Sequence, residues 1–239
     1  SVLTDGLRPD ATACGAAARA LADGGWRWEL ALRLLAAMRQ CGTGVGEALR
    51  TAVAGASARA GHWKAVLLLA QEGNEASQGD GPPLSAAFGS AASMACLKSQ
   101  QWGIALRLLD WMRNCDMRPN LVSHGSTISA CGKGRQWWQA LRCFEDAKQE
   151  DVALDVVTYN EVISSCGRSG IWVRALDILR DMNRKCSSPS SVTYNAIISA
   201  CEKGGQWEHA LDILVTMQDR RLTPNVISYS AAISACEKG

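Results

Sequence analysis

Apolar residues recur at helical spacing along most of the chain. In residues 191–225, two sets of apolar residues each fall at positions i, i+3, i+4 and i+7, which line one face of an α-helix. The first set is Tyr194, Ile197, Ile198 and Cys201, and the second is Trp207, Ala210, Leu211 and Leu214. Gly204 and Gly205 separate the sets and suit the left-handed conformation that ends a helix, whereas Pro224 stops the second helix. The pattern predicts two helices joined by a tight turn.

The same pattern repeats every 35 residues. Tryptophans at this interval open the second helix of each pair: Trp102, Trp137, Trp172 and Trp207. Cysteines at this interval lie on the apolar face of the first helix: Cys96, Cys131, Cys166, Cys201 and Cys236. The helix breakers recur as Gly134, Gly170, Pro119 and Pro189. A fixed interval of this length predicts a repeat protein built from helical hairpins.

One hairpin cannot bury its apolar stripe alone, so neighbouring hairpins must stack. We expect a single array over residues 1–239, with an all-α fold. Its parts are the tail of a preceding repeat at 1–10, two degenerate repeats at 11–85 with an elongated loop at 71–83, four regular 35-residue repeats at 86–225, and the first helix of a further repeat at 226–239. An uncapped array leaves a stacking face uncovered, and we therefore expect more chain beyond both ends.

Composition and charge narrow the function. The chain has 47% apolar residues and a net charge of +2, which argues against a histone-like binder but allows a local basic stripe. No apolar run approaches the roughly 18 residues that span a bilayer, and no leader opens the chain, although Ser1 leaves room for one that was removed. We expect no membrane insertion and no small-molecule substrate.

Candidate catalytic and metal-binding residues do not form recognisable sets. The periodic cysteines are expected to be small buried hydrophobes, and no CxxC pair that would indicate zinc is present. His124 takes the position of Tyr159 in the next unit and is expected in the packing, whereas His209 is expected to be solvated. No glycine-rich phosphate loop or nucleophile elbow occurs. We expect no catalytic residue, no metal and no cofactor, and therefore no enzyme.

Four features of the 35-residue unit resemble the pentatricopeptide repeat family. They are "VTYN" at its start, "AL" early in its second helix, Met near the end of that helix and "PN" at its close. The resemblance is strong over residues 86–239 and weaker over 1–85, and the tryptophan in the second helix marks a divergent subgroup. It implies a right-handed superhelical α-solenoid of stacked helix-turn-helix repeats that binds single-stranded RNA, one base per repeat.

The resemblance also implies which side chains read the bases. The asparagine of "VTYN" pairs with the residue that closes the same unit. The three pairs are Asn195 with Asn225, Asn160 with Ser190, and Ser90 with Asn120. The family's code gives a pyrimidine for the first two and adenine for the third. Gly125, paired with Asp155, has no side chain for reading.

Apolar residues three positions before each reading residue resemble those that sandwich the bases in the family. They are Val122, Val157, Val192 and Ile227. Ordinary packing between helices is an equally good explanation of these positions.

A series of cations recurs at the same interval near the end of each first helix. It comprises Lys98, Lys133, Arg168, Lys203 and Lys238. Such a row could follow a phosphate backbone, as the corresponding residue does in the family, and five contacts would give a salt slope of about −3.5. A cation in the last turn also stabilises the helix by about 0.3–1 kcal/mol. The two roles are compatible.

Two classes of function remain open. The leading one is sequence-selective binding of single-stranded RNA in organellar RNA processing, stability or translation, with a plastid or mitochondrion implied by the family. The alternative is a scaffold subunit of a large organellar assembly, a ribosome or a membrane complex, that contacts other protein subunits instead of reading RNA. Near-neutral charge and the gap at Gly125 favour the alternative.

Overall fold

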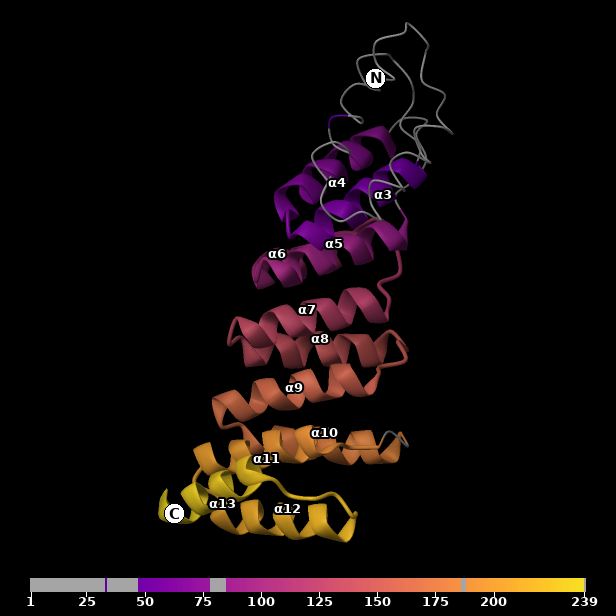
Figure 1. Ribbon diagram of the computed structural model, residues 1–239. Helices are drawn as coiled ribbons and strands as arrows, with labels where there is room; N and C mark the ends of the chain where they lie inside the picture. Colours follow the sequence, from indigo (N-terminus) through magenta and orange to yellow (C-terminus); the bar gives the residue numbers. More distant parts are fainter. Residues whose placement is uncertain (1–32, 34–46, 78–84, 186–187, 239) are drawn as a thin grey trace, which may run out of the picture. The chain divides into compact units, whose positions relative to one another are not determined.

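A computed structural model describes residue 33 and residues 47–77, 85–185 and 188–238. Every regular element in this part of the chain is an α-helix (Figure 1). The helices are α3 Glu47–Ala60, α4 Trp63–Ser77, α5 Ala86–Lys98, α6 Trp102–Asn114, α7 Leu121–Lys133, α8 Trp137–Gln149, α9 Val156–Ser169, α10 Trp172–Arg184, α11 Ser191–Lys203, α12 Trp207–Asp219 and α13 Val226–Lys238. The prediction of an all-α helical repeat solenoid is confirmed. The predicted tail at 1–10 and, Arg33 apart, the repeat at 11–46 lie outside the described residues.

The chain divides into two compact units, Ser1–Thr127 and Ile128–Gly239, with the boundary inside α7. In the first unit, α5 packs against α3, α4 and α6. In the second unit, α9 packs against α8, α10 and α11, and α11 also packs against α12 and α13. First helices of successive hairpins are therefore direct neighbours, and each hairpin buries its apolar stripe against the next one.

The core of the second unit consists of the periodic apolar positions. Tyr159 and Tyr194 are fully buried at equivalent places in α9 and α11, and the Tyr159 ring packs edge-on against Phe144 at 5.1 Å between centroids. In the first unit, His124 is also fully buried, as expected from its position in the repeat. Cys236 is exposed, against the expectation, because α11 and α12 are the only described helices that pack on α13.

Each hairpin turn contains one residue in the left-handed region. These residues are Gly61, Gln100, Arg135, Gly170 and Gly205, with φ between 56° and 78°. The next residue donates its main-chain N–H to the carbonyl of the core cysteine in four of these turns, as Gln206 does to Cys201 at 2.9 Å, and to the carbonyl of Ser57 in the turn at Gly61. The left-handed conformation expected at these glycines is confirmed at Gly170 and Gly205 and was wrong at Gly134 and Gly204, where this bond fixes the left-handed residue one position later.

The expected loop at 71–83 is partly helical. Helix α4 continues to Ser77 and includes Gly73, a residue whose cost inside a helix is only about 1 kcal/mol. The loop prediction was therefore wrong for residues 71–77, and residues 78–83 lie outside the described residues.

Candidate nucleic-acid interface

The residue that closes each unit also begins the first helix of the next unit. The carboxylate of Asp155 accepts hydrogen bonds from the N–H and the hydroxyl of Thr158, at 2.8 and 2.7 Å. Two further pairs repeat the bond to the N–H at 3.1 Å: Asn120 with Ser123, and Asn225 with Ser228. Such a cap contributes about 1 kcal/mol to helix stability. The sequence interpretation gave these residues base reading alone and missed the capping role.

Two of the predicted reading pairs are in direct hydrogen-bond contact. The hydroxyl of Ser90 donates to the side-chain oxygen of Asn120 at 3.0 Å. The amide Nδ2 of Asn195 donates to Oδ1 of Asn225 at 3.4 Å. Each pair joins residues that are 30 positions apart in the sequence. Polar side chains from the start and the close of one unit thus form a single small cluster.

The third pair is joined through a buried threonine of the next unit. Oγ1 of Thr193 lies 2.6 Å from Oδ1 of Asn160 and 3.4 Å from Oγ of Ser190. Thr193 was not among the predicted site residues. A polar residue at the third position of a first helix is a common capping partner, and the sequence gave no signal that it also contacts the preceding unit.

The apolar residues before the reading positions point to solvent. The exposed fractions are 46% for Val122, 65% for Val157, 62% for Val192 and 62% for Ile227. Packing between helices buries apolar side chains, so this explanation of the four positions does not hold. The exposure of Val157 and Val192 leaves a branched apolar group three residues before each of the reading residues Asn160 and Asn195.

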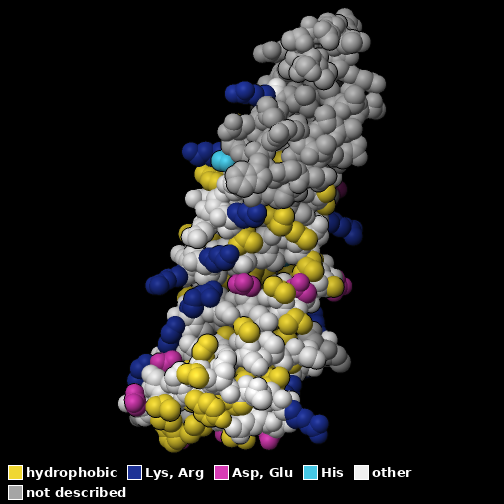
Figure 2. All heavy atoms as spheres, viewed as in Figure 1, with side chains coloured by type: hydrophobic (Ala, Val, Ile, Leu, Met, Phe, Trp, Pro, Cys, Tyr) yellow, Lys and Arg dark blue, Asp and Glu magenta, His cyan; other side chains and the backbone are white. Residues whose placement is uncertain are grey.

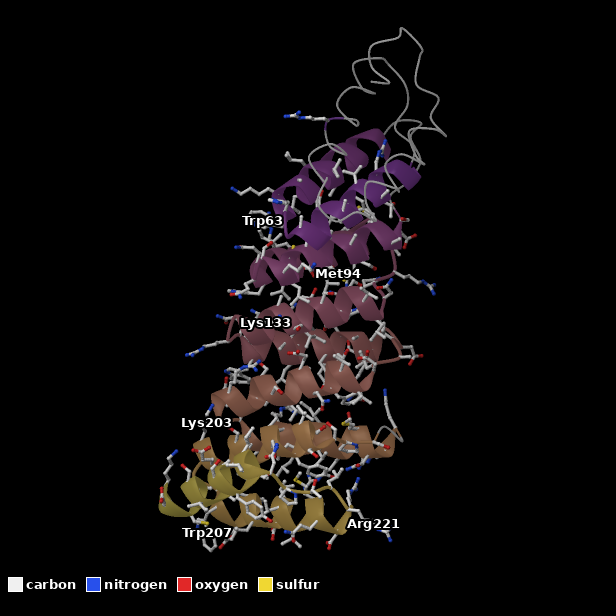
Figure 3. All side chains as sticks on the ribbon, in the orientation of Figure 1. Trp63, Met94, Lys133, Lys203, Trp207 and Arg221 are labelled. Atoms are coloured by element: carbon white, nitrogen blue, oxygen red, sulfur yellow. The ribbon has the colours of Figure 1, made fainter. Side chains whose placement is uncertain are left out.

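The cations of the periodic series all lie in the last turn of a first helix and are exposed. Figure 3 shows Lys133 and Lys203 at the same edge of the second unit, with Arg221 at the opposite edge. The Nζ of Lys203 donates to the main-chain carbonyl oxygen of Arg168 at 3.2 Å. This lysine therefore caps the end of the preceding first helix.

Glu202 holds the last cation of the series. Its Oε1 accepts from Nζ of Lys238 at 2.7 Å and from the hydroxyl of Ser234 at 2.8 Å. The hydrogen bond from Lys238 holds the pKa of the Glu202 carboxyl below its usual value, against the opposing effect of burial. Lys238 is consequently less available to a phosphate than its exposure suggests.

The second helices place aromatic side chains on another face. The rings of Trp172 and His209 are 4.7 Å apart at an interplanar angle of 49°, and His209 is half-buried, so the expectation that it is solvated holds only in part. Trp207 is 40% exposed. In the first unit, Trp63 and Trp111 line a pocket of about 500 Å³ whose wall also includes Arg107. Figure 2 shows apolar side chains gathered over α12 and α13.

The buried cysteines have the electrostatics of core thiols. Burial raises the pKa of the Cys96, Cys166 and Cys201 thiols to about 11 and that of Cys131 to about 12. Among the described residues, no three His, Cys, Asp or Glu side chains lie close enough to hold a metal ion. No helix within the same residues combines the length and apolarity that crossing a membrane requires.

Three family models match the chain over consecutive repeats. The PPR repeat family matches residues 189–238, the pentatricopeptide repeat domain matches 142–204, and the PPR repeat matches 122–152. These repeats define a helical-repeat solenoid with capped first helices. Residues 122–238 belong to the pentatricopeptide repeat family. No curated protein matches the sequence.

Solved structures of this family have the same fold. The pentatricopeptide repeat protein PPR10 in complex with an 18-nt psaJ RNA element matches at 25% identity and a TM-score of 0.71, over 94% of this chain and 32% of that one. PPR10 from maize, in a separate structure, matches at 26% identity and a TM-score of 0.65, over 96% and 32%. This chain therefore spans about a third of the length of PPR10.

A more distant structure shows the fold alone. The PPR domain of Arabidopsis thaliana protein-only RNase P 1, in complex with tRNA, matches at 13% identity with a TM-score of 0.67. The match covers 80% of this chain and 98% of that domain.

Proposed function

We propose that this chain binds single-stranded RNA along the face formed by its first helices, with one base at each polar pair. The observation that carries the proposal is the contact between side chains 30 residues apart, Ser90 with Asn120 and Asn195 with Asn225. Family membership and the likeness to RNA-bound PPR10 support the same role.

The exposed apolar residues fit the stacking part of such binding. Val157, Val192 and Ile227 occur once per repeat, three residues before the reading position. Their exposure to solvent is not explained by packing between helices, which would bury them. A base between two successive side chains would bury part of their apolar surface, which contributes about 25 cal/mol per Å². The proposed RNA is therefore single-stranded, because its bases must be unstacked.

The cation series supplies the proposed phosphate contacts. The net charge of +2 is small, so attraction must come from a local row of charges. Lys203 keeps two N–H donors after its bond to the Arg168 carbonyl. Lys238 must exchange Glu202 for a phosphate, and we expect it to contribute less.

A second candidate function is contact with a protein through the second helices. The pocket lined by Trp63, Trp111 and Arg107 has room for an apolar side chain, and Trp138 on α8 is 54% exposed. Exposed tryptophans are common in protein interfaces. In each unit these residues lie on different helices from the reading pairs, so a scaffold role and RNA binding are separable.

We propose a binding role without catalysis, in a plastid or mitochondrion, in the processing, stability or translation of a transcript. The basis for the compartment is family membership.

Binding of a pool of single-stranded RNAs by the purified chain at two salt concentrations tests the RNA-binding proposal. We expect measurable binding at low salt and a log–log slope between about −2 and −3.5, from roughly −0.7 per phosphate contact. Absence of binding at low salt would contradict it. Binding of a double-stranded pool with equal affinity would contradict the stacking part.

A further inference from the structure

Thr193 connects the start of its own helix to the reading residue of the preceding unit. Its Oγ1 accepts the main-chain N–H of Ser190 at 3.0 Å and donates its proton to Oδ1 of Asn160 at 2.6 Å. The Thr193 side chain has no exposed surface. A buried hydroxyl with both its donor and an acceptor site occupied holds a fixed orientation.

Ser228 makes the same connection one unit later. Its Oγ accepts the main-chain N–H of Asn225 at 3.1 Å and lies 2.6 Å from Oδ1 of Asn195, to which it donates. Ser228 is fully buried as well. The contact therefore recurs with the repeat, between residues 33 positions apart in both cases.

Capping alone does not explain this contact. Ser123 stands at the same position of α7 and accepts the N–H of Asn120 at 2.9 Å, so it performs the same capping role. Its hydroxyl donates to the main-chain carbonyl oxygen of Asn120, also at 2.9 Å. The reading residue on the preceding first helix is here Ser90 and not an asparagine. The hydroxyl thus contacts the preceding first helix at the two positions where an asparagine is present there to accept its proton.

The contact determines which part of the asparagine remains for a ligand. An amide side chain has an oxygen that accepts and a nitrogen that donates, and rotation by half a turn exchanges them. With Oδ1 of Asn160 and Asn195 held by a buried hydroxyl, the Nδ2 group is the one left for a ligand, and at Asn195 one of its two N–H donors goes to Oδ1 of Asn225. A base must then present an acceptor, such as the O2 carbonyl that cytosine and uracil share.

We propose that Thr193 and Ser228 are positioning residues for base recognition, which lock the amide groups of Asn160 and Asn195 with the donor toward the RNA. The proposal rests on the proposed RNA binding for its consequence, because the locked amide is the group that would read the base. The orientation itself is a property of the free protein and can be measured without RNA.

The experiment compares Ser228→Ala with the matched control Ser123→Ala in the full chain. Both variants lose a hydroxyl that accepts an N–H at a helix start, and only the first loses a bond to an asparagine on the preceding first helix. The first measurement is the NMR order parameter of the Asn195 side-chain amide in the free protein. We expect a value typical of a rigid group in the wild type and in Ser123→Ala, and a clear fall in Ser228→Ala.

The second measurement is base selectivity with single-stranded RNAs that differ at one nucleotide. Ser228→Ala should reduce the preference at the Asn195 position by roughly fivefold, the worth of one hydrogen bond, with other nucleotides unchanged. Ser228→Thr, which keeps the hydroxyl, should restore it. An Asn195 amide equally rigid in Ser228→Ala would overturn the positioning role. If Ser228→Ala makes the Asn195 amide mobile but the wild-type chain binds no RNA, the positioning role stands and the proposed function is overturned.

Discussion

The Nζ of Lys203 lies 3.2 Å from the main-chain carbonyl oxygen of Arg168, the cation one repeat earlier in the same series. One side chain therefore links the ends of α9 and α11 and brings a positive charge to the negative end of a helix. The capping and phosphate roles considered for this series are compatible in this geometry, because an ammonium group has three donors and the carbonyl uses one.

Replacement of Lys203 by glutamine separates charge from side-chain length. We expect affinity to fall for all RNA sequences alike, and the salt slope to flatten by about 0.7, because one phosphate contact is lost. Binding titrations at several salt concentrations measure both. The control is Arg221→Gln, which removes an exposed positive charge at the opposite edge of the second unit (Figure 3). Equal slopes for the two variants would contradict the assignment of Lys203.

Glu202 makes the fold sensitive to acid. Since the hydrogen bond from Lys238 lowers the pKa of this carboxyl in the folded state, its ionised form stabilises the fold at neutral pH. That contribution is lost as the pH falls below the ordinary value of 4.5 and through the lowered folded pKa. We expect Glu202→Gln to lose less thermal stability on acidification than the wild type does.

Thermal unfolding at several pH values gives this comparison. Glu237→Gln changes the acid at the same position of the next unit, where the side chain is exposed. It should keep the acid dependence of the wild type. A Glu202→Gln profile parallel to that of the wild type would show that the ion pair makes no difference to stability.

Close approach of two first helices depends on Gly167. A Cβ at this position would lie 2.5 Å from the main-chain carbonyl oxygen of Ala196 in α11. The backbone cannot move away as a flexible side chain would, and we expect Gly167→Ala to destabilise the chain by about 1–3 kcal/mol. Gly103 in α6 has open space instead, and Gly103→Ala should stabilise by about 0.5–1 kcal/mol. Chemical denaturation distinguishes the two, and equal effects would contradict the packing of α9 on α11.

The packing of the repeats determines which cysteine thiols a reagent can reach in the folded chain. Cys131, Cys166 and Cys201 are buried with raised pKa values, so at neutral pH their thiols are protonated and inaccessible. We expect an alkylating reagent to modify Cys115 and Cys236 in the folded chain and the buried residues only on unfolding. Peptide mass spectrometry identifies the modified positions. Rapid labelling of Cys166 in the native state would contradict the core assignment.

The fold was predictable because its determinants are periodic in the sequence. Apolar spacing predicted both helices of each hairpin, and the interval of 35 residues predicted their stacking. The turn geometry was less accessible. Arg135 adopts φ of 57° where glycine was expected one residue earlier, because the hydrogen bond to the carbonyl of Cys131 sets the register of the turn whatever side chain occupies it.

The site was predictable only in part. Family resemblance named the reading pairs, and the structure places Asn195 against Asn225. The bond from Ser228 to Asn195 crosses from one unit to the preceding one, and no residue type in a single unit indicates it. Contacts between repeats depend on how hairpins stack, which spacing along one chain segment does not specify.

Exchange of one reading residue tests the central claim of base recognition most directly. Asn195→Ser converts the pair with Asn225 into the combination found at Ser90 and Asn120, and it leaves the helix cap at Asn225 in place. Selection from a randomised single-stranded RNA library should show a pyrimidine at the Asn195 position for the wild type and adenine for the variant, with the other preferred positions unchanged. Identical preferences for the two proteins, or a loss of preference at every position, would contradict the account.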